Sequence, residues 1–482
     1  MLGIPRKLTA ALAPALLLAS VALPVGTAVA STSTPACAAP IMAGDTVLCG
    51  SLADGATYLI EVPAHWNRTL FLYSHGYVVP GSSNPAQDVG DPVTGGWLLS
   101  HGFALAGSSY AITGWSIAFA LPDQIATLNT FAHLVGRPHR TIAWGHSLGG
   151  IITAGLIQRY PHRFNAALPM CGVLAGGVAT WNTALDAAVA FQQLVASSVH
   201  VVGITNPTAN LTAAETALAT AQGSAQGRAR LALAAALGDT PGWFTPLSAQ
   251  PAATDFAAQE ANQFQWDAQV DFPFIFAFRA QLEALAGGNP SWTTGVDFRT
   301  QLAKSVDLRE VRALYKTAGL SLRGDLRTLN RATRIAASPA AVKYLAANIS
   351  FNGRISMPVL SMHTTGDGLV VPENEQAYAN VVHRAGRSFL LRQVFVHRAG
   401  HCAFTPAETI TSVKVLLHRM RTGHWTGLSL RPAAMNAAAA ALGATFNIFV
   451  SNKMVVPVAP AFTGFRTGLY LRPFDLSFRL RR

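Results

Sequence analysis

Short apolar runs alternate with helix-like segments along much of the chain. Apolar side chains at helical spacing mark 123–135, 148–160 and the segment that begins at Pro372. Other runs are almost continuously apolar, which is typical of strands buried on both faces of a parallel sheet. These runs are TYLIEV (57–62), TLFLYS (69–74), FALAGS (103–108), TIAWG (141–145), AALPM (166–170), PVLSMH (358–363) and RQVFV (392–396). The alternation predicts an α/β fold with a mainly parallel sheet.

Residues 175–350 lack this strand pattern and are too many for a loop. Thr212 and Glu215 have the spacing of a capping box ahead of an alanine-rich stretch. We therefore expect a large helical cap inserted over the active-site edge of the sheet. The predicted division is a core of residues 31–174 and 351–425, a cap of 175–350, and a C-terminal extension of 426–482 packed on the core, with a short helix at 437–441.

Residues 1–30 have the three parts of a secretory signal. Arg6 and Lys7 precede a long apolar stretch, and the small residues Ala-Val-Ala stand at 28–30. Prolines interrupt the stretch, which argues against the alternative of a membrane anchor. We therefore expect cleavage after Ala30 and a secreted, extracellular mature chain, in which no later stretch approaches the length of a membrane span.

A formal net charge of +12 adds little to this picture. The basic residues are scattered, and no basic run alternates with aromatic residues as a nucleic-acid-binding surface would require. A solvated surface is the simpler interpretation, and attraction to anionic cell walls or acidic substrates is the alternative. The sequence has no H-E-x-x-H or similar metal pattern. We predict no nucleic-acid partner, no metal and no cofactor; the oligomeric state is left open.

The stretch TIAWGHSLGG at 141–150 carries the candidate nucleophile. Ser147 follows a predicted strand and precedes a predicted helix, so it lies on the turn between them. Gly145 and Gly149 remove side chains that would collide in so tight a turn. The hydroxyl is thereby exposed at a helix N-terminus, where free N–H groups stabilise negative charge. Strand, G-x-S-x-G and helix together predict a catalytic serine.

Through GHSLGG at 145–150, which includes His146, the sequence resembles the α/β-hydrolase superfamily and, within it, secreted serine esterases and lipases. The resemblance covers roughly 45–172 and 352–422. It implies an α/β-hydrolase fold and a catalytic triad in the chain order serine, acid, histidine.

The acid and the histidine are therefore expected after late strands. Asp367 lies in a glycine-flanked loop and is the candidate acid, although Asp-Gly is also common in surface turns. Glu373 and Glu375 fall in the first turn of the next helix, where carboxylates are ordinary. His401, in GHCAFT, resembles the histidine loop of these esterases and is the candidate base. His397, at the end of the strand, is the alternative.

The resemblance also implies an oxyanion hole. His75 and Gly76 directly follow the run at 69–74 and resemble the His-Gly oxyanion motif of the family. The N–H groups of Tyr77 and Leu148 would then be the donors, with the N–H of Gly76 as the local alternative.

Aromatic residues near this edge have two interpretations each. Tyr110 and Trp115 follow a predicted strand and either shape the rim of the site or pack in the core. Aromatic residues of the predicted cap either line an acyl pocket or pack inside the cap. They are Phe272, Phe274, Phe276, Phe278, Trp181, Trp243 and Trp266.

Four cysteines follow the predicted signal segment, and an even count in an exported protein favours disulfides. Cys37 and Cys49 are close in sequence, so a bridge there would hold an end that otherwise frays. Cys171 and Cys402 are both expected at the carboxyl edge of the sheet, where a bridge would hold the loop of His401. Two buried thiols are the alternative for this second pair.

These features predict a secreted serine hydrolase that cleaves small-molecule or polymeric carboxylic esters through an acyl-enzyme. A serine peptidase or aminopeptidase would use the same triad and is the alternative. A non-catalytic binding protein would be expected to have lost a triad residue, whereas all of them are present. The sequence does not define the acyl group or the leaving group.

Overall fold

The computed structural model describes residues 37, 39–427, 430–451 and 454–474. The expected secretory signal at 1–30 lies outside the described residues. The described residues form one compact unit, so the division into a separately folding core and cap stays a prediction.

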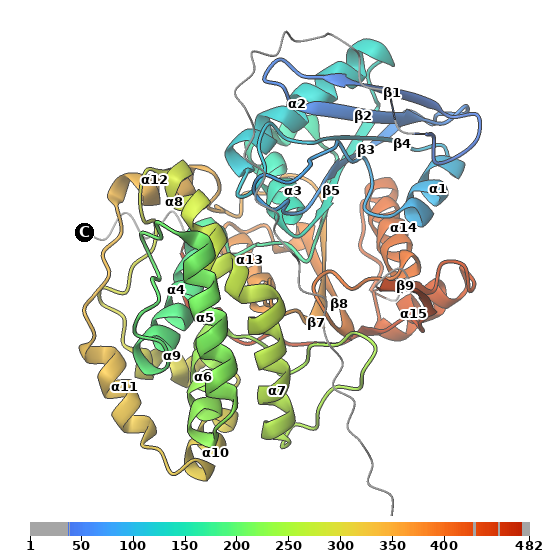
Figure 1. Cartoon of the computed structure of the whole chain (residues 1–482). Coiled ribbons are helices and arrows are strands. Elements are labelled where there is room, and N and C mark those ends of the chain that lie inside the picture. The colour runs from blue at the N-terminus through green and yellow to red at the C-terminus, as the bar shows by residue number, and fades with distance from the viewer. Residues whose placement is uncertain (1–36, 38, 428–429, 452–453, 475–482) are drawn as a thin grey trace, which may run out of the picture. The chain divides into compact units, whose positions relative to one another are not determined.

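The described strands are β1 (Thr46–Ser51), β2 (Thr57–Val62), β3 (Thr69–Ser74), β4 (Ala104–Ser108), β5 (Arg140–His146), β6 (Ala166–Met170), β7 (Val359–Gly366), β8 (Leu391–Ala399), β9 (Ile448–Ser451), β10 (Met454–Pro457) and β11 (Phe462–Thr463). Within the described part of the chain, nine of them form one sheet in the order β1-β2-β4-β3-β5-β6-β7-β8-β11, which Figure 1 shows from the side. The run from β4 to β8 is parallel. The expected mainly parallel sheet is therefore confirmed.

One strand prediction is wrong in its direction. β2 covers the expected run at 57–62 but pairs antiparallel with both β1 and β4. β1 was not expected at all, because its side chains are exposed or half-buried and therefore give no continuous apolar run. The two strands form an antiparallel edge on a parallel sheet, which is a common arrangement.

Helices cover both faces of the sheet. They are α1 (Pro92–Ser100), α2 (Ile117–Leu134), α3 (Leu148–Arg159), α13 (Glu373–Arg384), α14 (Pro406–Thr422) and α15 (Pro432–Ala440), with short 3₁₀ turns at Pro161–Arg163 and Ser388–Leu390. Phe71 belongs to the hydrophobic cluster that includes α1, α14 and α15, whereas its neighbour Leu72 belongs to the cluster that includes α2, α3 and α13. Successive side chains of a strand point to opposite faces, so a continuous apolar run fills both layers.

The segment between β6 and β7 is helical. Its helices are α4 (Gly177–Leu194), α5 (Pro207–Gln222), α6 (Ala225–Gly238), α7 (Phe256–Trp266), α8 (Arg279–Ala286), α9 (Phe298–Lys304), α10 (Leu308–Thr317), α11 (Leu322–Arg331) and α12 (Pro339–Ala347), with π-helical turns η2 (Asp267–Asp271) and η3 (Phe274–Phe278). Figure 1 shows α4 to α7 side by side, and buried side chains of α4, α5 and α6 form much of a separate hydrophobic cluster. We refer to α4–α12 as the cap.

The predicted capping box at Thr212 and Glu215 is wrong. α5 begins at Pro207, and the side chain of Asn206 accepts a hydrogen bond from the N–H of Ala209 at 3.1 Å. Thr212 lies inside the helix and donates its hydroxyl to the carbonyl of Thr208. Asparagine followed by proline starts the helix earlier, because proline favours the first helical position.

The C-terminal extension contacts both the core and the cap. α15 packs on the core and begins before the expected 437–441, while β11 pairs antiparallel with β8. Farther along, the buried guanidinium of Arg472 forms an ion pair with Asp186 of α4. The extension was expected on the core alone, and the contact with α4 adds the cap.

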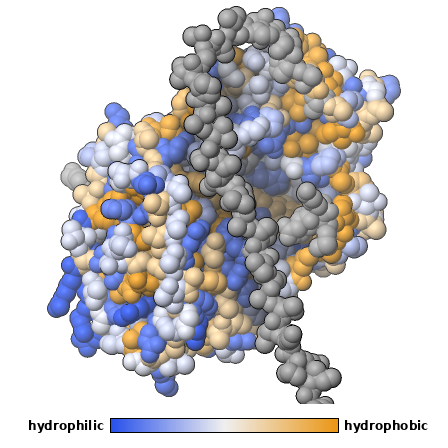
Figure 2. Space-filling view, viewed as in Figure 1, coloured by the Kyte–Doolittle hydropathy of each residue, from blue (hydrophilic) through white to orange (hydrophobic). Residues whose placement is uncertain are grey.

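The face of the molecule in Figure 2 mixes hydrophilic and hydrophobic residues without a single dominant area. None of the described helices combines the length and apolar composition that a membrane crossing needs.

The cap buries carboxyl groups that have no Lys or Arg ion pair among the described residues. Glu260 on α7 and Glu310 on α10 each leave one side-chain oxygen without a hydrogen bond. Burial raises the pKa of Glu260 to about 7. Burial and the negative charge of Asp307 raise the pKa of Glu310 to about 9. Each group is therefore held neutral in the folded protein at a pH where it is ionised in an unfolded chain.

These shifts predict that the folded state loses stability as pH rises. Below about pH 4 these groups bind protons in both states, and above about pH 9 the folded state must hold them ionised. We expect Tm to fall by about 5 °C or more between pH 5 and pH 9, measured by calorimetry. Glu310→Gln keeps the shape of the neutral acid and should reduce this fall. A Tm that rises with pH, as relief of the net positive charge alone would give, would contradict the prediction.

Candidate active site

Ser147 lies on the turn between β5 and α3, where the sequence places it. Its backbone has φ 59° and ψ −122°, a strained conformation for a residue with a side chain. The turn is pressed against the end of β3. A Cβ at Gly145 would lie 2.3 Å, and one at Gly149 1.8 Å, from the carbonyl oxygen of Ser74. Both glycines are therefore required because the end of β5 and the start of α3 pass close to the end of β3.

Asp367 and His401 are brought together from different strand ends. The carboxyl of Asp367 is fully buried, and its Oδ1 accepts the N–H of Val370 at 3.0 Å. Its Oδ2 lies 2.8 Å from Nδ1 of His401. This leaves Nε2 as the ring nitrogen that is available for proton transfer.

Ser147 and His401 lie at the same carboxyl edge of the sheet, but no hydrogen bond between them is recorded among the described residues. Nε2 of His401 lies 3.4 Å from Sγ of Cys402 instead. Hydrogen bonds between catalytic groups are often long or absent until substrate binds. The hydrogen bond between Asp367 and His401 is therefore already formed, whereas the one between His401 and Ser147 is not.

His397, the alternative base, points elsewhere. Its side chain is exposed, its Nδ1 lies 3.4 Å from the hydroxyl of Thr365, and its ring packs against Trp243. No carboxylate contacts it among the described residues, so nothing orients this imidazole toward Ser147.

A second histidine lies behind Asp367, and the sequence analysis missed it. His363 of β7 is fully buried, with its Nε2 2.7 Å from the carbonyl of Val370 and its Nδ1 3.1 Å from Glu375. Burial lowers the pKa of His363, but the hydrogen bond and charge of Glu375 outweigh it and raise the pKa overall. Glu375 also accepts a hydrogen bond from Gln393. The contact of Glu375 with His363 was not expected from the sequence, because Glu375 lies in the first turn of α13, where carboxylates are common.

His146 has a packing role. Its Nδ1 lies 3.1 Å from the hydroxyl of Tyr73. Burial, with the nearby His401, lowers the pKa of His146 to about 4. The imidazole is therefore neutral at ordinary pH and fixes the turn before Ser147 without adding charge.

The loop of His75 and Gly76 passes next to Ser147. A Cβ at Gly76 would lie 3.5 Å from Cβ and 4.0 Å from Oγ of Ser147. The N–H of Tyr77 has no recorded acceptor among the described residues. The N–H of Leu148 is at the first position of α3, where a helix supplies no partner. Both expected donors are thus free to bind an oxyanion.

Tyr110 supports this loop from the interior. It is buried, its ring stacks on the imidazole of His75 at 4.0 Å, and its hydroxyl donates to the carbonyl of His75 at 3.1 Å. Of its two interpretations, the structure favours the core. Burial lowers the pKa of His75, which keeps the stacked pair neutral.

Both expected disulfides are present. Cys37 is bonded to Cys49, and Cys171 is bonded to Cys402 with a Cα–Cα distance of 5.3 Å. The second bridge joins the residue after β6 to the residue after His401. It therefore ties the histidine loop to the sheet edge next to the Ser147 turn.

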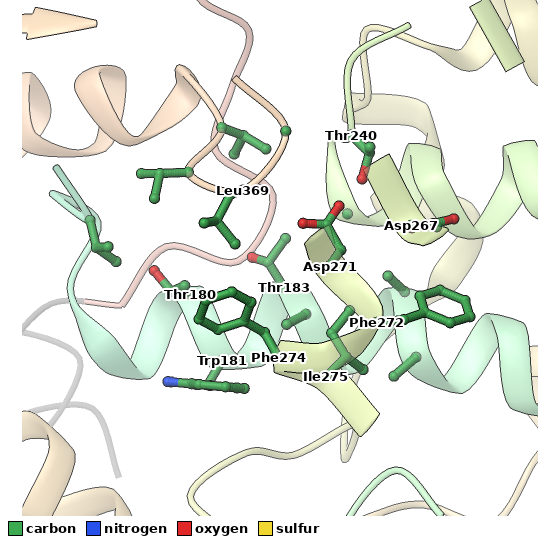
Figure 3. Close-up of a pocket in the computed structure, with 18 of the residues that line it drawn as sticks. Thr180, Trp181, Thr183, Thr240, Asp267, Asp271, Phe272, Phe274, Ile275 and Leu369 are labelled. Atoms are coloured by element: carbon green, nitrogen blue, oxygen red, sulfur yellow. The ribbon is translucent and has the colours of Figure 1, made fainter. Parts of the chain in front are cut away.

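A pocket opens at Ser147 and extends between the sheet edge and the cap. Trp115, Tyr77 and Leu369 line it from the core, and Figure 3 shows Trp181, Phe272, Phe274 and Ile275 around it from the cap. His401 is not among the lining residues. Of the other cap aromatics, Phe276 lines the pocket, whereas Phe278, Trp243 and Trp266 do not.

The described residues contain no group of three or more His, Cys, Asp or Glu side chains that could hold a metal ion.

Comparison with known proteins gives one sequence relative of note. No protein-family model matches the chain. The o-phthalyl amidase of Xanthobacter agilis is 28% identical over 423 residues, which cover 81% of this chain and 90% of the amidase.

Similar solved structures are more distant. The rice cell wall degrading esterase LipA from Xanthomonas oryzae is 14% identical, with a TM-score of 0.33 and coverage of 73% of this chain and 82% of that one. An esterase from Aspergillus oryzae is 12% identical, with a TM-score of 0.40 and coverage of 78% and 79%. The acylaminoacyl peptidase of Pyrococcus horikoshii is 8% identical, with a TM-score of 0.35 and coverage of 79% and 42%. Likeness at this level indicates nothing about activity.

The mainly parallel sheet, the serine on a strained turn between strand and helix, and the similarity to the amidase point the same way. Together they make the chain similar to α/β-hydrolases in its sheet and its serine turn, and similar in sequence to an amidase.

Proposed function

We propose that the chain is a secreted serine hydrolase that cleaves carboxylic esters through Ser147, His401 and Asp367. One observation carries the proposal: Ser147, on its strained turn, opens into a pocket at the sheet edge where Asp367 holds His401 at 2.8 Å. A half-buried serine that lines a pocket, at the same sheet edge as an imidazole that a buried carboxylate orients, is an arrangement suited to nucleophilic acyl transfer.

The reaction follows from these positions. Nε2 of His401 turns toward Ser147 and takes the hydroxyl proton as Oγ attacks the acyl carbonyl. Asp367 stabilises the imidazolium by its bond to Nδ1. The N–H groups of Leu148 and Tyr77 stabilise the oxyanion, and one such donor contributes about 3 kcal/mol. His401 then protonates the leaving group. Water next attacks the acyl-enzyme while His401 takes its proton, and His401 returns that proton to Oγ of Ser147 as the acid leaves.

The lining of the pocket favours an acyl group with a mostly apolar body. Its walls are mostly aromatic and aliphatic side chains from the core and the cap. An acyl group that fills such walls gains about 25 cal/mol for each Å² of apolar surface removed from water.

Amide hydrolysis is the second candidate, and the o-phthalyl amidase favours it. That protein's name describes an amide of an aromatic acid, and an aromatic acyl group suits the lining of the pocket described here. The same triad serves both reactions, although an amide needs firm protonation of its leaving nitrogen by His401.

The test is pre-steady-state hydrolysis of p-nitrophenyl benzoate beside the matched p-nitroanilide. p-Nitrophenolate is a good leaving group, so acylation should be faster than deacylation, and we expect a burst of p-nitrophenol close to the enzyme concentration. Faster release from the anilide than from the ester would establish the amide as the substrate class. No burst, no turnover and no labelling by a fluorophosphonate would overturn the proposal.

A further inference from the structure

Two carboxyl groups face the pocket in which the substrate is proposed to bind. Asp267 and Asp271 are the only Asp, Glu, Lys, Arg or His side chains among the described residues that line it. The other lining residues are neutral, and most are apolar. Figure 3 shows the carboxyl of Asp271 near the centre of the view, between Thr183 and Thr240.

Neither carboxyl has a partner. Each residue is only 8% exposed, and neither side chain makes a recorded hydrogen bond or ion pair among the described residues. A carboxyl that is nine-tenths buried without a partner is costly to maintain. Since no neighbouring residue satisfies Asp271, its natural partner is a group that enters the pocket.

The local backbone presents these groups to the pocket. Asp267 and Asp271 begin and end the π-helical turn η2, and Pro273 and the second turn η3 follow directly. A π-helical turn inserts one extra residue per turn and shifts the direction of the side chains that follow; such turns are frequent at functional sites. Asp271, Phe274 and Ile275 all line the pocket from this segment.

The surroundings of Asp271 are negative. Burial raises its pKa, and the charges of Asp267 and Asp367 raise it further. Burial and Glu260 likewise raise the pKa of Asp267, to about 8. Among the described residues, no Lys, Arg or His side chain forms an ion pair with either carboxyl.

We propose that Asp271, with Asp267 behind it, binds a positively charged amine on the acyl group of the substrate. The substrates are then amine-bearing carboxylic esters or amides, an inference that rests on the proposed function. An ammonium group supplies the hydrogen-bond donors and the positive partner charge that no described side chain gives to Asp271.

Binding of the amine should also release a proton. In the empty pocket the raised pKa of Asp271 favours its neutral form, whereas an ammonium nearby favours the ionised form. The released proton is a signature that a merely structural carboxyl would not give.

The test compares matched p-nitrophenyl esters of para-(aminomethyl)benzoate, para-ethylbenzoate and para-(carboxymethyl)benzoate. A charge-assisted hydrogen bond contributes about 1.5–3 kcal/mol, so kcat/KM should favour the amine over the ethyl ester by about 10-fold or more. In Asp271→Asn that ratio should fall to about 1.

Asp239→Asn is the matched control. Asp239 is a buried carboxyl of the cap with an oxygen that lacks a hydrogen bond, but it does not line the pocket. Its backbone is left-handed at φ 58°, a conformation that asparagine tolerates. The amine preference should survive this change.

A second arm does not depend on catalysis. Benzylammonium and benzyl alcohol are titrated calorimetrically into Ser147→Ala protein in buffers of different ionisation enthalpy, with and without Asp271→Asn. We expect tighter binding of benzylammonium, with proton release that Asp271→Asn removes. Turnover of all three esters with equal preference, or preference for the carboxylate, would overturn the amine site while the hydrolase proposal stands. Absence of turnover together with Asp271-dependent amine binding would overturn the hydrolase proposal and keep the amine site.

Discussion

Ser147→Ala is expected to lower ester hydrolysis by about 10⁴-fold or more, because removing the nucleophile leaves only binding and the oxyanion donors. The change removes one oxygen and keeps the strained backbone at φ 59°, so Tm should stay within about 1 °C of the parent. A fluorophosphonate should label the parent protein on Ser147 and fail to label the variant.

Ser100→Ala is the matched control, since Ser100 is an exposed serine at the end of α1, outside the pocket. It should keep full labelling and activity. Labelling of a different serine in Ser147→Ala protein would show that the nucleophile was assigned to the wrong turn.

His401→Ala is expected to lose about 10³-fold or more in kcat, and His397→Ala less than about 10-fold. Asp367 orients only His401, whereas His397 is exposed and packs against Trp243. Both variants are measured on one ester across a range of pH, because loss of the base should also abolish the acidic limb of the pH–rate profile. The reverse ranking would make His397 the base.

The sheet was predictable because burial on both faces leaves a direct trace in the sequence. β2, β3 and β6 have the bounds that their apolar runs predicted. β1 escaped because a half-buried edge strand leaves no such trace, and the direction of β2 cannot be read from composition. α2 begins at Ile117, before the expected 123, and has Pro122 inside it. This start was missed because the first turn is apolar on all sides and shows no helical spacing.

The candidate site was only partly predictable. The serine turn carries a local signature, since close approach to β3 demands glycines. The groups that orient or surround it lie far apart in sequence, and their roles come from the fold. His363 and Glu375 looked like strand and helix-start residues, and Tyr110 gave no sign that it stacks under the loop of His75. Asp267 and Asp271 became notable only when their burial without a partner was known.

The two disulfides also impose an order on maturation. Cys37 and Cys49 are 12 positions apart, whereas Cys171 and Cys402 are 231 apart. A chain made from its N-terminus completes the first pair early, and Cys171 then stays a free thiol until the whole cap has been synthesised. During that interval its thiolate can attack the Cys37–Cys49 bridge and form a mixed pairing. Of the two bridges, the one that holds the loop of His401 is therefore the later to become possible, because its second cysteine follows the whole cap in the chain.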